Sequence, residues 1–150
     1  MLTARLVKMI EKHADQLTKK VVRELETDPR TPAYHKLDPQ DNYARVFDVV
    51  SHLGEWLDCN SETATEHAYR KLGQKRFREG VPMAELVSAL MLTKQTLRKY
   101  IKTEGWVDSA VHLYQQIELY DMISYFFDRA IYFAVVGYER EARSAENRLS

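Results

Sequence analysis

Residues 113–138 are apolar on almost every side of the helix that they predict. Of these 26 positions, 18 are apolar or aromatic. They form two stripes that repeat at steps of three and four residues, whereas a helix that packs along one line needs only one stripe. The first stripe is Leu113, Ile117, Tyr120, Ser124, Phe127, Ile131, Ala134 and Tyr138, and the second is Leu119, Ile123, Phe126, Ala130, Phe133 and Gly137. Such a helix is typically buried on two sides, in the centre of a domain or between its domain and a second subunit.

The composition indicates a single soluble domain. A chain of 150 residues fits one domain with a real core. Lys plus Arg equals Asp plus Glu at 22 each, so no global field attracts nucleic acid or an anionic membrane. One cysteine, Cys59, excludes an internal disulfide framework, and with no signal peptide we expect a cytoplasmic protein. The longest apolar run, residues 130–136, is too short to span a bilayer.

Glycine and proline fall between periodic segments, which favours an all-α fold. Asp38 is expected to cap a helix that has Pro39 at its first position, and Gly80 to end another in a left-handed conformation. Asn60 or Ser61 should begin the helix that ends at Gly80. Five helices are predicted, at about residues 2–26, 38–57, 60–80, 82–103 and 108–143. We expect one domain over residues 1–150, with residues 140–150 as the start of a linker helix.

The histidines are the obvious candidates for cofactor or phosphoryl chemistry. His13 lies on the apolar stripe of the first helix, which favours a hydrogen-bonded core or boundary residue. His52 and Glu55 have the spacing of a di-iron bundle, but their order is reversed and a second pair is missing. For haem the usual proximal position has no histidine, which leaves His67 as the candidate. We therefore predict no cofactor and no metal. The alternatives are a globin-type sensor that binds haem or a small ligand, and a bundle for histidine phosphotransfer or kinase dimerisation.

A basic cluster at residues 70–78 places Lys71, Lys75 and Arg78 on one helical face. Such a face could dock a phosphate-rich partner. A solvated face is favoured, because Glu66 precedes Arg70 at a spacing that supports an ion pair within the helix.

Ten of the 16 aromatic residues lie within residues 100–138. Five of these are tyrosines of the last helix, and tyrosine combines a large apolar surface with a polar tip. It suits an interface or core packing, which we favour, and it also suits the wall of a ligand cavity, which sequence cannot distinguish from a filled core.

Three phrases resemble those of a known family: residues 28–34 (DPRTPAY), residues 69–86 (YRKLGQKRFREGVPMAEL) and residues 119–130 (LYDMISYFFDRA). They are similar to the N-terminal domain of the RsbR and RsbRD co-antagonists of the RsbT kinase, which is also attached to bacterial signalling kinases. The resemblance covers residues 6–139. It implies a globin-like helical bundle without haem, which pairs as a dimer and passes its state through a C-terminal helix to an output domain.

From the stripes and the resemblance together we predict a non-enzymatic sensory and protein-interaction domain of a bacterial stress-response regulator. Its partners would be a second copy, a downstream signalling protein and an unidentified small molecule, with no nucleic acid and no membrane. The predicted dimer interface is Leu113, Ile117, Tyr120, Phe127, Ile131, Ala134 and Tyr138.

Overall fold

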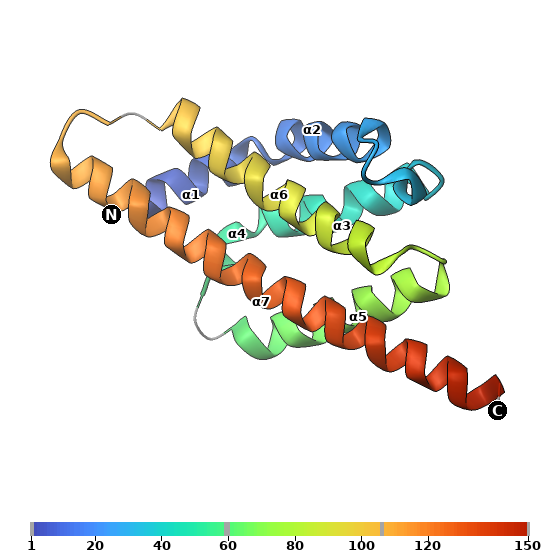
Figure 1. The fold of residues 1–150 in the computed structure, drawn as a ribbon. Coiled ribbons are helices and arrows are strands. Elements are labelled where there is room, and N and C mark those ends of the chain that lie inside the picture. The colour runs from blue at the N-terminus through green and yellow to red at the C-terminus, as the bar shows by residue number, and fades with distance from the viewer. Residues whose placement is uncertain (1, 59–60, 106, 150) are drawn as a thin grey trace.

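A computed structural model describes residues 2–58, 61–105 and 107–149, so Cys59 and Asn60 lie outside the described residues. Every regular element in the described ranges is a helix (Figure 1). In chain order these are α1 (Leu2–Lys12), α2 (Ala14–Thr27), the 3-10 helix η1 (Pro32–His35), α3 (Pro39–Ser51), α4 (Leu53–Trp56), α5 (Glu62–Arg78), α6 (Met83–Glu104) and α7 (Ala110–Leu149). The predicted all-α fold with a long C-terminal helix is confirmed.

Helix α7 runs along the whole bundle and organises the other helices. At 40 residues it is about 60 Å long. Helix α5 lies beside it in the same direction, since Glu62 pairs with Arg129 and Arg78 pairs with Glu141 farther along both helices. Helices α6 and α7 lie side by side, α2 packs against α6, and α3 packs against α2 (Figure 1). The C-terminal turns of α7 extend past the ends of the neighbouring helices.

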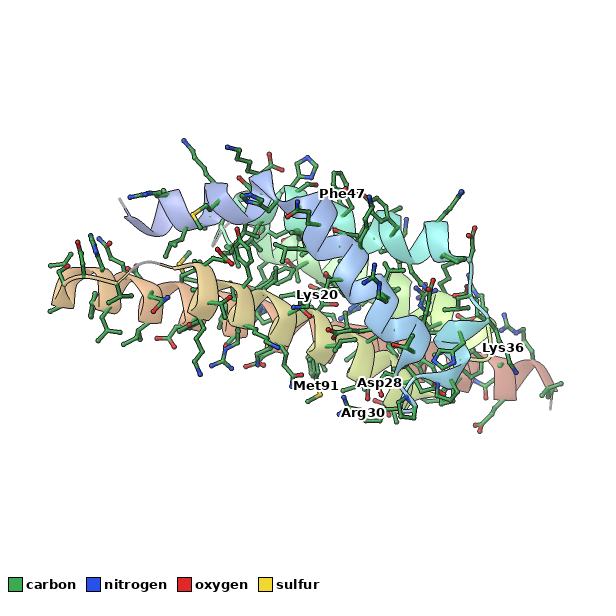
Figure 2. The ribbon with its side chains drawn as sticks, turned by 90° about the horizontal axis from the view of Figure 1, so that it is seen from above. Lys20, Asp28, Arg30, Lys36, Phe47 and Met91 are labelled. Atoms are coloured by element: carbon green, nitrogen blue, oxygen red, sulfur yellow. The ribbon has the colours of Figure 1, made fainter. Side chains whose placement is uncertain are left out.

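The core lies between α7 and the helices around it. Its most enclosed side chains include Ile10, Leu53, Leu86, Leu97, Ile101, Leu119, Ile123 and Phe127. Charged side chains such as Lys20, Arg30 and Lys36 lie on the outside of the α2 half (Figure 2). None of the described helices is both long enough and apolar enough to cross a membrane.

Two predicted helix ends are confirmed. Asp38 caps α3, because its carboxylate accepts a hydrogen bond from the backbone N–H of Gln40, and Pro39 occupies the first helical position. After α5 the chain turns at Gly80, whose φ of 77° lies in the left-handed region that favours glycine.

Several predicted boundaries were wrong. The first helix is broken at His13, whose backbone angles (φ −101°, ψ 21°) are not helical and whose ring contacts the carbonyl oxygen of Met9 at 2.9 Å and the hydroxyl of Tyr100 at 3.2 Å. The stretch between the first two predicted helices contains η1, and the second predicted helix is divided into α3 and α4. The last helix continues to Leu149 instead of ending near residue 143.

Candidate functional site

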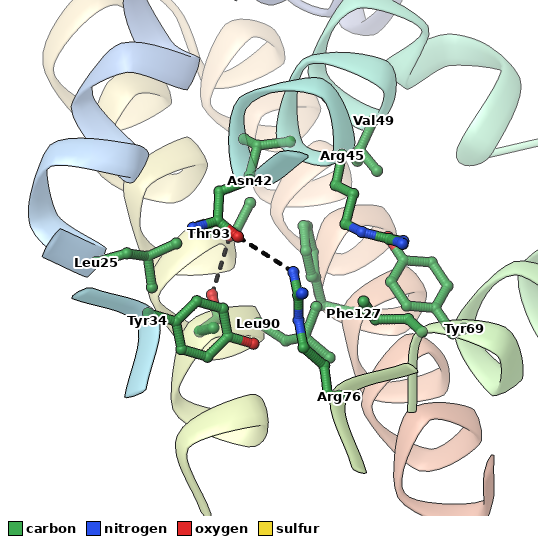
Figure 3. Close-up of a pocket in the computed structure, with 13 residues that line it drawn as sticks. Leu25, Tyr34, Asn42, Arg45, Val49, Tyr69, Arg76, Leu90, Thr93 and Phe127 are labelled. Atoms are coloured by element: carbon green, nitrogen blue, oxygen red, sulfur yellow. Dashed lines mark hydrogen bonds between the residues drawn. The ribbon is translucent and has the colours of Figure 1, made fainter. Parts of the chain in front are cut away.

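A cavity of about 60 Å³ that is partly open to solvent lies between the helices of the bundle. Helices α2, α3, α5, α6 and α7 and the η1 turn all contribute to its wall (Figure 3). Most of the wall is apolar, and the polar groups gather on one side. The lining residues are Leu25, Tyr34, Asn42, Arg45, Val46, Val49, Tyr69, Leu72, Arg76, Ala89, Leu90, Thr93 and Phe127.

The buried guanidinium of Arg76 is the central polar group of this cavity. Its side chain is only 2% exposed. It donates hydrogen bonds to Glu79 (Nη1 to Oε1, 2.8 Å) and to Asn42 (Nη2 to Oδ1, 3.2 Å), and its Nη1 lies 3.4 Å from Asp41 Oδ2. It also lies over the ring of Tyr34, 5.2 Å from the ring centroid. A buried cation that is paired and stacked in this way fixes α3, α5 and η1 relative to one another.

Two donors at the cavity are not satisfied. The amide nitrogen Nδ2 of Asn42 and the Nε of Arg76 are buried and make no well-aligned hydrogen bond among the described residues, although the hydroxyl of Tyr34 lies within reach of the Arg76 guanidinium. Asn42 is 2% exposed. A buried N–H without an acceptor costs about 1 to 3 kcal/mol, so this side of the cavity favours an occupant that accepts hydrogen bonds.

Burial also sets the ionisation of the surrounding groups. It raises the pKa of both Tyr34 and Tyr69 above the ordinary phenol value, so both hydroxyls stay neutral near pH 7. Burial tends to raise the pKa of Asp41 too, but the hydrogen bond from Lys75 and the charges of Arg45 and Lys75 outweigh it and leave that pKa below its ordinary value. The polar side of the cavity therefore holds charged guanidinium, neutral phenol and ionised carboxylate groups.

The second candidate site is the outward face of α7. Tyr114, Tyr125 and Tyr132 are 71%, 61% and 63% exposed, and Ile117 is 46% exposed. These positions are spaced so that they share one side of the helix. We call Tyr114, Ile117, Tyr125 and Tyr132 the tyrosine face. A row of large exposed side chains of this kind is typical of an interaction surface.

The predicted interface residues do not all lie on that face. Leu113 and Ile117 are exposed. Phe127 and Ala134 are buried in the chain's own core, where a second subunit cannot reach them while the fold is intact. Tyr120, Ile131 and Tyr138 are half-buried against the core.

The far end of α7 is attached to the bundle through Glu141. This carboxylate is mostly buried and accepts hydrogen bonds from Arg78 at 3.1 Å and Arg148 at 3.4 Å. The bond from Arg78 holds the pKa of Glu141 below its ordinary value. Most residues beyond Glu141 are exposed, and this contact ties the start of the projecting turns to the bundle.

The histidines lie away from the cavity. His13 is half-buried and bonded to Met9 and Tyr100, which matches the boundary role predicted for it. His67 is exposed, and His112 pairs with Asp108. Among the described residues, no three His, Cys, Asp or Glu side chains come together as a metal site would require.

The basic face is solvated, as predicted. Lys71 is exposed, and the side chains of Lys75 and Arg78 are 40% and 65% exposed although they pair with Asp41 and Glu141. Arg76 lies inside the protein, and this was missed. It follows Tyr69 and Leu72 at steps of three and four, so the buried side of α5 was present in the sequence pattern.

Comparison with known families matches residues 15–150 to the RsbT co-antagonist protein RsbRD N-terminal domain. The chain belongs to this family. The match covers every residue of the cavity and all of α7. An RsbRD N-terminal domain is a regulatory domain of stress signalling, which confirms that part of the prediction. No curated protein and no solved structure matches the chain, so likeness to a globin stays an expectation.

Proposed function

We propose that this RsbRD N-terminal domain is a sensory and protein-interaction module that pairs with a second copy through α7. The single observation that carries the proposal is the tyrosine face, which exposes four large side chains on one side of a 40-residue helix. A two-fold pair would bring the same apolar patch of both copies together, as a self-complementary interface requires. Burying tyrosine rings supplies apolar contact area while the hydroxyls keep their access to water.

Signal transmission would use the same helix. Phe127 of α7 lines the cavity, and Tyr125 lies less than one turn away on the outer face. A change in what fills the cavity would shift α7, and the pairing of two α7 helices would shift with it. The altered pair would be read at the C-terminal turns beyond Glu141. Such a mechanism needs two arrangements that the signal stabilises to different degrees.

The family description names co-antagonists of RsbT, and we extend this to the chain. Its output would be contact with an RsbT-type signalling protein in the cytoplasm, without catalysis by the domain itself. The projecting end of α7 is the part best placed for that contact, because it is exposed and leads away from the bundle (Figure 1).

The pairing is tested with Ile117→Glu and Tyr125→Glu, each studied by size-exclusion chromatography with light scattering. Both side chains are exposed in the single chain, so the fold should survive each substitution. In a two-fold interface each substitution buries two uncompensated carboxylates, which should break the dimer. The matched control is Ala44→Glu at an exposed position of α3, which should stay dimeric. Dimers of all three variants would show that the tyrosine face is not the interface.

A further inference from the structure

We infer that this cavity binds a small monocarboxylate anion, of the size range from acetate to butyrate. The inference deepens the proposed sensory function by naming the class of ligand that the domain would sense. Binding is measured separately from pairing, so either claim can fail while the other stands.

The unsatisfied donors determine which end of the ligand is recognised. Asn42 Nδ2 and Arg76 Nε belong to side chains that are each 2% exposed, and both side chains line the cavity. Both are N–H donors, so the occupant must present acceptor atoms to them. Figure 3 shows Arg76 and Asn42 pointing toward one another, with Tyr34 beside them. A carboxylate can accept a hydrogen bond from a donor at such a place, and hydrogen bonds between charged partners are the stronger kind.

The balance of charge favours an anion over a neutral acceptor. The ion-pair network at this side of the cavity contains three cations, Arg45, Lys75 and Arg76. It contains two carboxylates, Asp41 and Glu79. One positive charge of this network is therefore left over, and Arg45 and Arg76 themselves line the cavity. A carboxylate occupant would complete the network.

The apolar part of the cavity wall determines the size and polarity of the rest of the ligand. Leu72, Leu90 and Phe127 are buried and apolar, and so suit a short hydrocarbon tail. One water molecule needs at least about 10 to 15 Å³ of cavity volume. If each non-hydrogen atom of a ligand takes the place of one water, a cavity of about 60 Å³ admits roughly four to six such atoms. Acetate, propionate and butyrate fall in this range. Drug-sized ligands need pockets of about 300 Å³ or more.

Arg45 marks the side where a ligand would enter. Its side chain lines the cavity and is 36% exposed, whereas that of Arg76 is 2% exposed. A carboxylate would meet the guanidinium of Arg45 first and then reach Asn42 and Arg76.

The first test is a nuclear magnetic resonance titration of the whole ¹⁵N-labelled chain with sodium butyrate, and with sodium chloride at equal ionic strength. We expect a saturable shift of the Asn42 side-chain amide with butyrate and none with chloride. Butyramide, which has nearly the same shape and no charge, should give a much weaker shift. No butyrate shift, or an equal response to butyramide, would overturn the inference.

The second test fills the cavity by substitution. Ala89→Val adds two methyl groups at the cavity wall, and Ala84→Val makes the same change at an exposed position of the same helix. Butyrate should raise the melting temperature of the wild type and of Ala84→Val, but not of Ala89→Val. An equal rise in all three proteins would indicate a general salt effect, and the inference would be wrong.

Discussion

Gly73 on α5 and Gly137 on α7 lie at the crossing where the two helices approach each other most closely. Gly73 faces the carbonyl oxygen of Ala134, three residues before Gly137, and Gly137 faces that of Arg70, three residues before Gly73. A Cβ on Gly73 would lie 2.0 Å from the carbonyl oxygen of Ala134, and one on Gly137 would lie 2.2 Å from that of Arg70. Both distances are far inside van der Waals contact. The two helices therefore approach at a distance that only glycine permits at these two positions.

The crossing predicts that Gly73→Ala and Gly137→Ala each lower the free energy of unfolding by at least about 2 kcal/mol, because backbone has to move to admit the methyl group. At a helix position with free space, replacing glycine by alanine should stabilise the protein by about 1 kcal/mol. A loss of stability would therefore indicate that the two helices are in close contact at that position. Urea unfolding followed by circular dichroism measures it.

The control for the crossing is Gly54→Ala in α4. A Cβ there would meet Val7 Cγ1 at 3.4 Å, which is ordinary contact. We expect unchanged stability, or a gain of no more than about 1 kcal/mol. If Gly73→Ala behaves like Gly54→Ala, the two helices are not packed as closely as described.

Arg76 and Lys75 both pair with Asp41 but differ in burial, and this predicts unequal costs of removal. Arg76→Met takes a buried cation from Glu79, Asn42 and Asp41 and should cost at least about 3 kcal/mol. The side chain of Lys75 is 40% exposed, so Lys75→Met should cost less than about 1 kcal/mol. Chemical unfolding of both variants under the same conditions makes the comparison. Equal costs would contradict the internal position of Arg76.

The lowered pKa values of Asp41 and Glu141 predict acid sensitivity. In both cases the folded pKa lies below the unfolded one, so the unfolded chain binds more protons as the pH falls. Their contribution to the free energy of unfolding is complete when the pH is above the ordinary pKa values, 3.8 for Asp41 and 4.5 for Glu141. It is lost as the pH falls through the lower pKa values of the folded state. Melting temperatures measured from pH 7 downward should decline in this acid range. Glu141→Gln should decline less steeply, because one of the two groups has been removed.

Glu141 also predicts the behaviour of the projecting end of α7. Glu141→Gln weakens the contacts with Arg78 and Arg148, so amide hydrogens at residues 142–149 should exchange faster than in the wild type. Glu139→Gln, at an exposed neighbouring position, should leave their exchange unchanged. Hydrogen exchange followed by mass spectrometry resolves the segment. Equal protection in both variants would mean that the attachment lies elsewhere.

The sequence predicted those parts of the fold that depend on local chemistry. Asp38, Pro39 and Gly80 each end or begin a helix by a mechanism that acts within a few residues, and all three were located correctly. The break at His13 was missed because it involves Tyr100, far away in the chain. Periodicity continues across such a break and cannot reveal it.

The candidate site was harder to predict because burial of a polar group depends on what surrounds it. Arg76 belongs to a basic cluster in the sequence, and nothing local shows that α3 and η1 enclose it. The two stripes of α7 illustrate the same limit. Phe127 and Ala134 belong to the same stripe as Ile117, but they are buried and Ile117 is exposed. The reason is that a stripe with a seven-residue repeat drifts around a straight helix by about 20° per repeat. Phe127 and Ala134 therefore face the core.

Pairing through α7 is the central claim, and native mass spectrometry of the untagged chain at several concentrations tests it most directly. The account predicts a dimer whose share rises with concentration across the micromolar range. A monomer at every concentration would contradict it, and would leave the tyrosine face as a surface for a different protein.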